Sequence, residues 1–254
     1  MEQNEYRVMA KVELTHWWFV HRYHRIRDII YKEWLKKNNS LQIFDAGCGT
    51  GGLIRQLKNE IYVKEVRGCE PQEWAHKYML EMGLNVLNCR IEEMINTKDK
   101  FDIVLCMDVF YHRNLDPNKA ILALSNILKP GGILILNVAA MKCLKRAHDE
   151  KDWGARRYLP YELKSIIDKV DFNIMSLKYW NSWLTPFIWM QSMWYQISTN
   201  QLKQRLGDES ALNPPPIFVN RMLIILLKIE QYFSKFVPLP FGSSLMAVAR
   251  KEFI

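Results

Sequence analysis

A strand that runs directly into a glycine-rich turn, LQIFDAGCGTGG at residues 41–52, constrains this chain more than any other segment. Leu41, Ile43 and Phe44 form the apolar, partly β-branched run of a buried strand, and the glycines let bare backbone approach a ligand. After Gly52 the apolar residues recur at helical spacing, so the turn directs the N-terminus of a helix towards an anionic or polar group. The segment predicts a strand, turn and helix unit that binds a nucleotide-type cofactor.

Two cofactors fit this unit. Gly47, Gly49 and Gly52 satisfy GxGxxG, the dinucleotide fingerprint, which alone is a weak signal. A second predicted strand, 65–69, leads into Glu70, which stands where a carboxylate would bind the ribose diol of either cofactor. The glycines and Glu70 therefore leave an NAD-type oxidoreductase open.

Further segments follow in a fixed order around the turn. Asp45 precedes the glycines, and the later segments are CysGluPro at 69–71, FDIVLCMDVFYH at 101–112 and LKPGGILILNV at 128–138. Over roughly residues 40 to 140 this set resembles the class I S-adenosylmethionine-dependent methyltransferases. The resemblance implies S-adenosyl-L-methionine as the cofactor. Two alternatives to a methyltransferase therefore stay open: the oxidoreductase, and a methyltransferase-like scaffold that binds a cofactor or partner without turnover.

The resemblance also implies cofactor contacts. Asp45 would lie near the cofactor's amino group, and Glu70 would accept from both ribose hydroxyls. Arg90 stands where many relatives have an acid for the adenine amino group and cannot accept a hydrogen bond. Ile91 would then supply an apolar wall, unless this segment simply begins a helix. The predicted cofactor-binding residues are Asp45, Gly47, Cys48, Gly49, Gly51, Glu70, Pro71, Arg90, Ile91, Asp108 and Val109.

The strand predicted at 101–107 ends at Asp108, and ligands bind beyond the carboxyl ends of such strands. Tyr111 and His112 are therefore candidates by position, either for chemistry or for lining the pocket. Methyl transfer from a sulfonium depends mainly on alignment of the reactants, and a general base is needed only if the acceptor must lose a proton.

Motifs outside the core extend the resemblance to nearly the whole chain. HisAsp, ArgArgTyr and GluLeu occur in order within 139–163, HisTrpTrpPhe occupies 16–19, and ProPheGlySerSerLeu occupies 240–245. They resemble a subgroup of the same superfamily that often accompanies bacterial cell-surface glycan genes. The resemblance implies O-methylation of a small or lipid-linked metabolite such as a saccharide.

These motifs supply the remaining candidate residues. His148 is the expected base because an imidazole has a suitable pKa, with Asp149 as its orienting partner, unless the pair only tethers the insertion. The aromatic N-terminal segment forms either an acceptor wall or an anchor for a helix from Val20 onward. The predicted catalytic residues are His148, Asp149 and His112, and the predicted substrate-binding residues are His16, Trp17, Trp18, Tyr111, Arg156, Arg157 and Tyr158.

The composition indicates which kinds of binding partner and which cellular location to expect. The formal charge of +8 arises from basic residues spread along the chain, with no nucleic-acid-reading motif, so nucleic acid is not expected. No run of about 18 apolar residues predicts a spanning helix, and the N-terminus is polar. Five cysteines without a CxxC pair indicate reduced thiols, no metal site and a cytoplasmic location. No obligate protein partner is inferable.

The last third contains two predicted helices, one starting at 185–186 and one at 218–233, with many tryptophan and other apolar residues. We favour an acceptor-specificity cap; peripheral membrane contact is the alternative, and it would make the location membrane-peripheral.

The expected architecture is a single methyltransferase domain, 1–254. It comprises a helical and aromatic lid at 1–38, a cofactor-binding core at 40–140, an insertion and helical cap at 141–240 and a closing strand at 241–254. The resemblance implies an α/β, Rossmann-like fold. Its seven-stranded, mostly parallel sheet would carry helices on both faces, with the last strand antiparallel.

Overall fold

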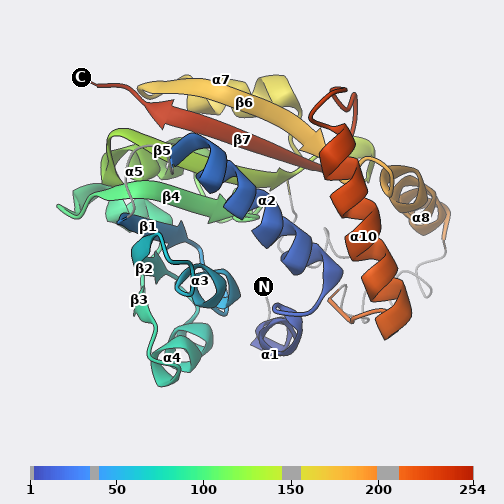
Figure 1. Cartoon of the computed structure of the whole chain (residues 1–254), viewed down its shortest axis with the longest axis horizontal. Helices are drawn as coiled ribbons and strands as arrows, with labels where there is room; N and C mark the ends of the chain where they lie inside the picture. The colour runs from blue at the N-terminus through green and yellow to red at the C-terminus, as the bar shows by residue number, and fades with distance from the viewer. Residues whose placement is uncertain (1–2, 35–39, 145–155, 199–211, 254) are drawn as a thin grey trace.

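The helices and strands of the chain follow one another as Figure 1 shows, in a computed structural model that describes residues 3–34, 40–144, 156–198 and 212–253. In chain order they are α1 (Gln3–Val12), α2 (Trp17–Trp34), β1 (Leu41–Ala46), α3 (Gly52–Leu57), β2 (Val63–Cys69), α4 (Glu73–Glu81), β3 (Asn85–Leu87), η1 (Ile91–Asn96), β4 (Phe101–Met107), α5 (Pro117–Ile127), β5 (Leu128–Ala139), η2 (Lys142–Leu144), α7 (Pro160–Ile167), β6 (Phe172–Trp180), α8 (Thr185–Ile197), α10 (Ile217–Phe233) and β7 (Ser244–Lys251).

The sheet has seven strands in the order β3-β2-β1-β4-β5-β7-β6. β1 pairs in parallel with both β2 and β4, whereas β7 lies antiparallel between β5 and β6. This confirms the predicted mixed sheet with its antiparallel last strand. The strand order reverses between β1 and β4, so the crevice beyond their carboxyl ends is the expected ligand site of an open α/β sheet.

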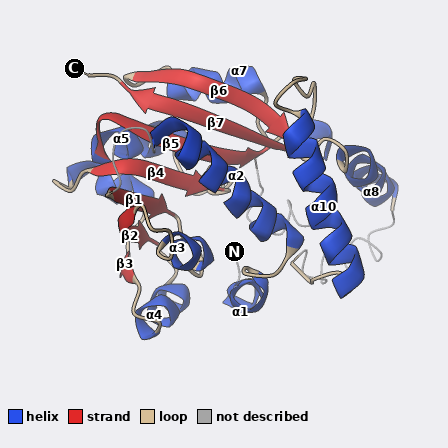
Figure 2. Ribbon diagram, viewed as in Figure 1, coloured by secondary structure: helices blue, strands red, loops and turns tan. Residues whose placement is uncertain are grey.

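Helices cover both faces of the sheet, as Figure 2 shows for α2 on one side and α5 on the other. The residues of β4 alternate between two buried apolar clusters. Val104 and Cys106 pack with α5 and α7, whereas Ile103 and Leu105 pack with α2 and α3. A parallel strand that is buried on both faces needs such an uninterrupted apolar run, which is why the predicted strand 101–107 matches β4.

The N-terminal helix α2 begins at Trp17, three residues before the predicted start at Val20. It buries Ile26 and Ile30 against the sheet, and α10 runs alongside it (Figure 1). Among the described residues, no helix combines the length and apolar character needed to cross a bilayer.

Candidate functional site

A cavity of about 840 Å³ opens beyond the carboxyl ends of β1 and β4. Its walls come from the glycine loop, the ends of β2, β4 and β5, the segment 16–22 and the first turns of α8. The volume lies towards the upper end of the range for small-molecule pockets, roughly 300–1,000 Å³. The cavity therefore has room for more than one small ligand.

Most of the predicted site residues meet in this cavity. The ones in its wall are His16, Trp17, Trp18, Asp45, Gly47, Cys48, Gly49, Glu70, Pro71, Arg90, Ile91, Asp108, Val109, Tyr111, His112 and Arg157.

Three predicted residues do not line the cavity. Gly51 faces Leu84 and Met79 in the core. Arg156 is exposed and donates to the carbonyls of residues 113 and 115, and the buried Tyr158 donates from its hydroxyl to Phe110 O (2.8 Å). Arg156 and Tyr158 thus fasten the loop after β4 instead of lining the cavity. His148 and Asp149 lie outside the described residues.

The glycine loop is hydrogen-bonded to the end of β2. The N–H groups of Gly47 and Cys48 both donate to Cys69 O, at 2.9 and 3.0 Å. Gly47 has a φ of +75°, and a Cβ there would lie 2.5 Å from Cγ2 of Val109. The loop therefore presents bare backbone beside Val109, which only glycine permits.

Asp45 contributes a buried carboxylate beneath this loop. Its Oδ1 has no hydrogen-bond partner among the described residues. Burial raises its pKa to about 7; nearby Arg22 lowers the pKa, whereas Glu70 and Glu13 raise it further. A buried, unpartnered acid of this kind fits a cationic ammonium group, which would offset the cost of burying its charge.

Glu70 accepts hydrogen bonds from three donors of the chain. These are the Tyr6 hydroxyl (2.8 Å), Gln72 N (3.2 Å) and Gly49 N (3.0 Å). Burial raises the pKa of Glu70, and these three bonds lower it. A carboxylate has about four acceptor positions, so little capacity remains for a ligand unless a hydroxyl takes the place of Tyr6.

A carboxylate of the chain itself, Glu13, occupies the N-terminus of α3. It accepts from the Thr50 hydroxyl (2.7 Å) and packs against Gly52, and burial raises its pKa. The carboxylate of Glu13 thus supplies an anionic group of the kind expected at the N-terminus of α3.

The sequence interpretation missed the residues of α1 and the turn that follows it. Tyr6, Met9 and Glu13 contact Glu70, Gly49 and Gly52 respectively. Their spacing of three and four residues places them on one helical face, and this spacing was the available signal.

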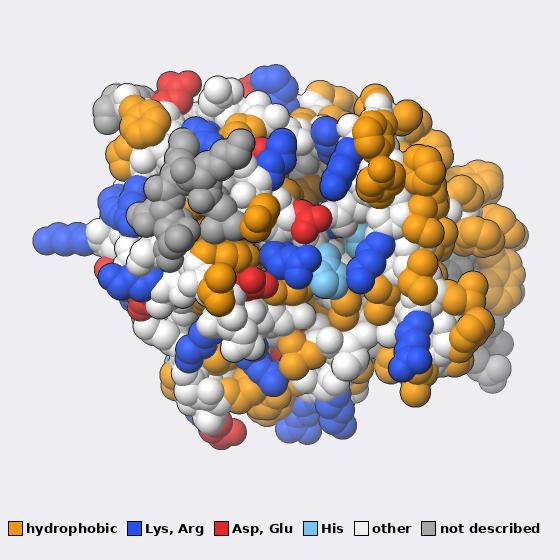
Figure 3. Space-filling model, in the orientation of Figure 1, with side chains coloured by type: hydrophobic (Ala, Val, Ile, Leu, Met, Phe, Trp, Pro, Cys, Tyr) orange, Lys and Arg blue, Asp and Glu red, His pale blue; other side chains and the backbone are white. Residues whose placement is uncertain are grey.

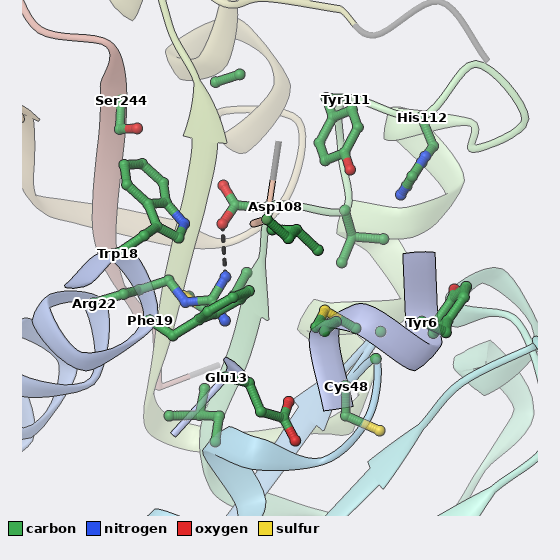
Figure 4. A pocket seen from close by; sticks show the side chains of 18 of the residues that line it. Tyr6, Glu13, Trp18, Phe19, Arg22, Cys48, Asp108, Tyr111, His112 and Ser244 are labelled. Carbon is green, nitrogen blue, oxygen red and sulfur yellow. Dashed lines mark hydrogen bonds and ion pairs between the residues drawn. The ribbon is translucent and has the colours of Figure 1, made fainter. Parts of the chain in front are cut away.

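Asp108 joins the sheet to the N-terminal helix α2. Figure 4 shows its carboxylate paired with Arg22, at 2.7 Å. Its other oxygen accepts from Asn137 Nδ2 (2.6 Å), and Asn137 Oδ1 accepts from Trp180 Nε1 (2.8 Å). Asp108 has a φ of +59°, a strained conformation of the kind that clusters at functional sites.

The aromatic N-terminal segment lines the cavity and also anchors the helix to the fold, whereas its role as an acceptor wall stays a prediction. Trp18 stacks on Trp180 with centroids 4.6 Å apart, and Trp17 N donates to Asn220 Oδ1 (2.8 Å). His16 is buried, and burial lowers its pKa to about 4, so its imidazole is neutral near pH 7.

The chain is similar in sequence to known methyltransferases. A family model described as a methyltransferase domain matches residues 18–196. The chain is 34% identical over 102 residues to a ubiquinone biosynthesis O-methyltransferase of Colwellia psychrerythraea, covering 38% of this chain and 41% of the relative. It is 32% identical over 148 residues to the protein of the same name from Rickettsia prowazekii, covering 52% and 57%. The chain thus spans about half the length of these curated relatives.

Solved structures show the same fold. An S-adenosylmethionine-dependent methyltransferase from Clostridium acetobutylicum superposes with a TM-score of 0.56 at 13% identity, covering 91% of both chains. At this identity the likeness concerns the fold alone.

Proposed function

The chain belongs to the family of methyltransferase domains, and on that premise we propose that it transfers the methyl group of S-adenosylmethionine to an oxygen of a small, hydroxylated acceptor. A saccharide, free or linked to a lipid, is the acceptor class we favour. The observation that carries the proposal is a single cavity that joins the glycine loop to aromatic and hydrogen-bonding residues of the N-terminus and α8.

The loop end of the cavity would hold the cofactor. Asp45 suits the ammonium of its methionine moiety, Gly47 presents bare backbone beside Val109, and Ile91 offers an apolar wall. Glu70 would accept from the ribose hydroxyls if these displace Tyr6. When bound, S-adenosylmethionine supplies a sulfonium methyl that is already activated, so the chain's own residues have mainly to orient the acceptor and exclude water.

The opposite end of the cavity suits a hydroxylated acceptor. Trp17 and Trp18 provide aromatic faces, while Arg157 and Asn181 provide polar groups in the wall. The Oδ1 atom of Asn181 is buried without a hydrogen-bond partner among the described residues. A hydroxyl of the acceptor would satisfy this oxygen, and a few such polar groups fix orientation in an otherwise apolar pocket.

Two histidines are our candidate bases. His112 lies in the cavity wall, where Figure 4 shows it beside Tyr111, and His148 is followed by Asp149 outside the described residues. Replacement of the acting base by alanine is expected to lower kcat roughly 100-fold or more, because general-base catalysis contributes about that much. Rate assays of His112→Ala and His148→Ala with saturating cofactor measure it.

Cofactor affinity must be retained in the variant that loses turnover. His76→Ala is the matched control, because His76 of α4 hydrogen-bonds to Val86 O of β3 and does not line the cavity. Normal turnover in both His112→Ala and His148→Ala would contradict a histidine base.

The affinity for S-adenosylhomocysteine is expected to rise about tenfold between pH 6 and pH 8. Asp45 has a pKa of about 7 without ligand, and an adjacent ammonium lowers it, so binding releases a proton below pH 7. The affinity is therefore lost as the pH falls through 7. Calorimetry in two buffers of different ionisation enthalpy measures the proton release. Asp45→Asn should remove this pH dependence, and its persistence would assign it to another group.

The proposed function is tested by ligand binding and then by turnover. Calorimetry should detect S-adenosylhomocysteine and fail to detect NAD; the reverse would favour the oxidoreductase. Methyl-labelled cofactor is then incubated with a panel of glycans, lipid-linked saccharides and phenols. Label in a hydroxylated acceptor supports the proposal, whereas cofactor binding without any transfer favours a non-catalytic scaffold.

A further inference from the structure

The helix α8 exposes its apolar face to solvent and buries polar residues, the reverse of a usual amphipathic surface helix. Phe187, Met190, Trp194 and Ile197 recur along one helical face and are 54 to 78% exposed. The same helix buries Thr185, Ser192 and Tyr195. The apolar face of α8 therefore points away from the protein.

The helix α10 repeats this arrangement. A stripe of apolar side chains at spacings of four and three residues lies opposite the buried Leu227 and Glu230. Its members are all exposed: Phe218, Met222, Ile225, Ile229 and Tyr232. Figure 3 shows apolar side chains gathered over α10 and the adjoining end of the molecule. Contiguous exposed apolar surface of this kind marks an interaction site.

Basic side chains flank the stripe. Arg221, Lys228 and Lys235 follow at intervals of seven residues, which places them along one side of α10 and its extension. The only acid in the described segments 183–198 and 212–241 is Glu230, which is fully buried. The described residues of α8 and α10 themselves therefore expose apolar side chains and basic residues, and an exposed acid, Asp28 of α2, lies beside them and accepts from Gln231 (3.0 Å).

We propose that this face, formed by α8 and α10, docks on the surface of a lipid bilayer that contains anionic lipids. Exposed apolar residues and tryptophan on one face, flanked by lysine and arginine, are the features of helices that lie in the membrane interface. A second copy is the less suitable occupant. Two copies packed through this face would bring Arg221, Lys228 and Lys235 of both chains together, and Asp28, the exposed acid that accepts from Gln231, already pairs with Arg27.

The docking face is continuous with the cavity. Leu184, Phe187 and Ile188 at the start of α8 line the cavity, and Phe187 also belongs to the exposed stripe. A bilayer against α8 would therefore present lipids at the mouth of the cavity. This part of the inference rests on the proposed function, and it selects the lipid-linked acceptor over the free one.

Cosedimentation with vesicles tests the docking without any need for turnover. The full chain should sediment with vesicles that mix phosphatidylglycerol and phosphatidylcholine, and much less with phosphatidylcholine alone. Arg221→Gln with Lys228→Gln and Lys235→Gln should weaken partitioning about a hundredfold, because each basic residue near an anionic surface contributes about fivefold. High salt should weaken the wild type similarly.

A second variant tests the apolar stripe. Phe218→Ser with Met222→Ser and Trp194→Ser should reduce partitioning at least about tenfold. Ile61→Ser with Tyr161→Ser is the matched control, because both residues are exposed at other places on the surface. All variants must bind S-adenosylhomocysteine like the wild type, which verifies their fold.

Three results would overturn the proposal. The first is no sedimentation of the full chain with anionic vesicles at low salt, and the second is an equal loss of partitioning in the control variant. The third is a dimer that does not bind vesicles and that the substitutions in the apolar stripe dissociate. Vesicle binding without methyl transfer would leave the docking in place and refute the proposed function. Methyl transfer without vesicle binding would support the proposed function and refute the docking.

Discussion

Gly47→Ala is expected to lower kcat/KM about a hundredfold, because a shift of about 1 Å at a reacting site has that effect. The new Cβ would lie 2.5 Å from Cγ2 of Val109, a short β-branched side chain that has little freedom to turn away. Val109 lines the cavity, so its displacement changes the space that we propose for the cofactor. Calorimetry with S-adenosylhomocysteine should show a matching loss of affinity.

Gly83→Ala separates this effect from backbone strain. Gly83 also has a positive φ, +68°, but a Cβ there meets nothing within 4 Å. Its substitution should cost about 1 kcal/mol of folding free energy, with unchanged cofactor affinity. If Gly47→Ala binds the cofactor as tightly as Gly83→Ala does, the loop is not part of the cofactor site.

Glu230→Ala is expected to lower the free energy of unfolding by about 3–5 kcal/mol and the melting temperature by roughly 10 °C. The fully buried Glu230 carboxylate accepts from Asn181 N (2.7 Å) and Trp183 N (2.8 Å). It also attracts the buried Arg25, whose Nε has no hydrogen-bond partner among the described residues. Its removal leaves a buried donor, Asn181 N, a partly buried donor, Trp183 N, and the buried cation of Arg25 without this acceptor.

Gln231→Ala is the neighbouring control for Glu230→Ala. Gln231 makes an exposed hydrogen bond to Asp28, so its loss should change stability by at most about 0.5 kcal/mol. Glu230→Gln should fall between the two, because it keeps one acceptor oxygen. Chemical denaturation of the three variants gives the comparison. Equal stability of Glu230→Ala and Gln231→Ala would refute the anchoring role of Glu230.

That Asp45, Gly47, Gly49 and Glu70 meet in one cavity was predictable because these residues are close in sequence or on neighbouring strands. Asp45, Gly47 and Gly49 belong to one turn, and Glu70 follows the neighbouring parallel strand. Parallel pairing brings such strand ends to one edge of the sheet. The strand β4 was predicted with its bounds because both of its faces need apolar residues.

The contacts made by the N-terminal segment could not be predicted in the same way. Tyr6 reaches Glu70 across 64 residues of sequence, and Arg22 reaches Asp108 across 86. No local periodicity specifies such a partner. The sequence also could not predict which of three adjacent residues faces the cavity. Arg157 lines the cavity wall, whereas its neighbour Tyr158 packs in the core.

The sequence by itself determined the fold class, the glycine loop and the helical faces of α8 and α10, because strand runs, turn glycines and helical spacing are properties of neighbouring residues. Only the tertiary structure decided which way those helical faces point. Periodicity shows that Phe187 and Trp194 share a face, but the medium that this face meets depends on where the rest of the chain packs. In α10 the buried side is fixed by Leu227 and by Glu230, whose bonds to Asn181 and Trp183 in the turn before α8 hold the apolar stripe outwards.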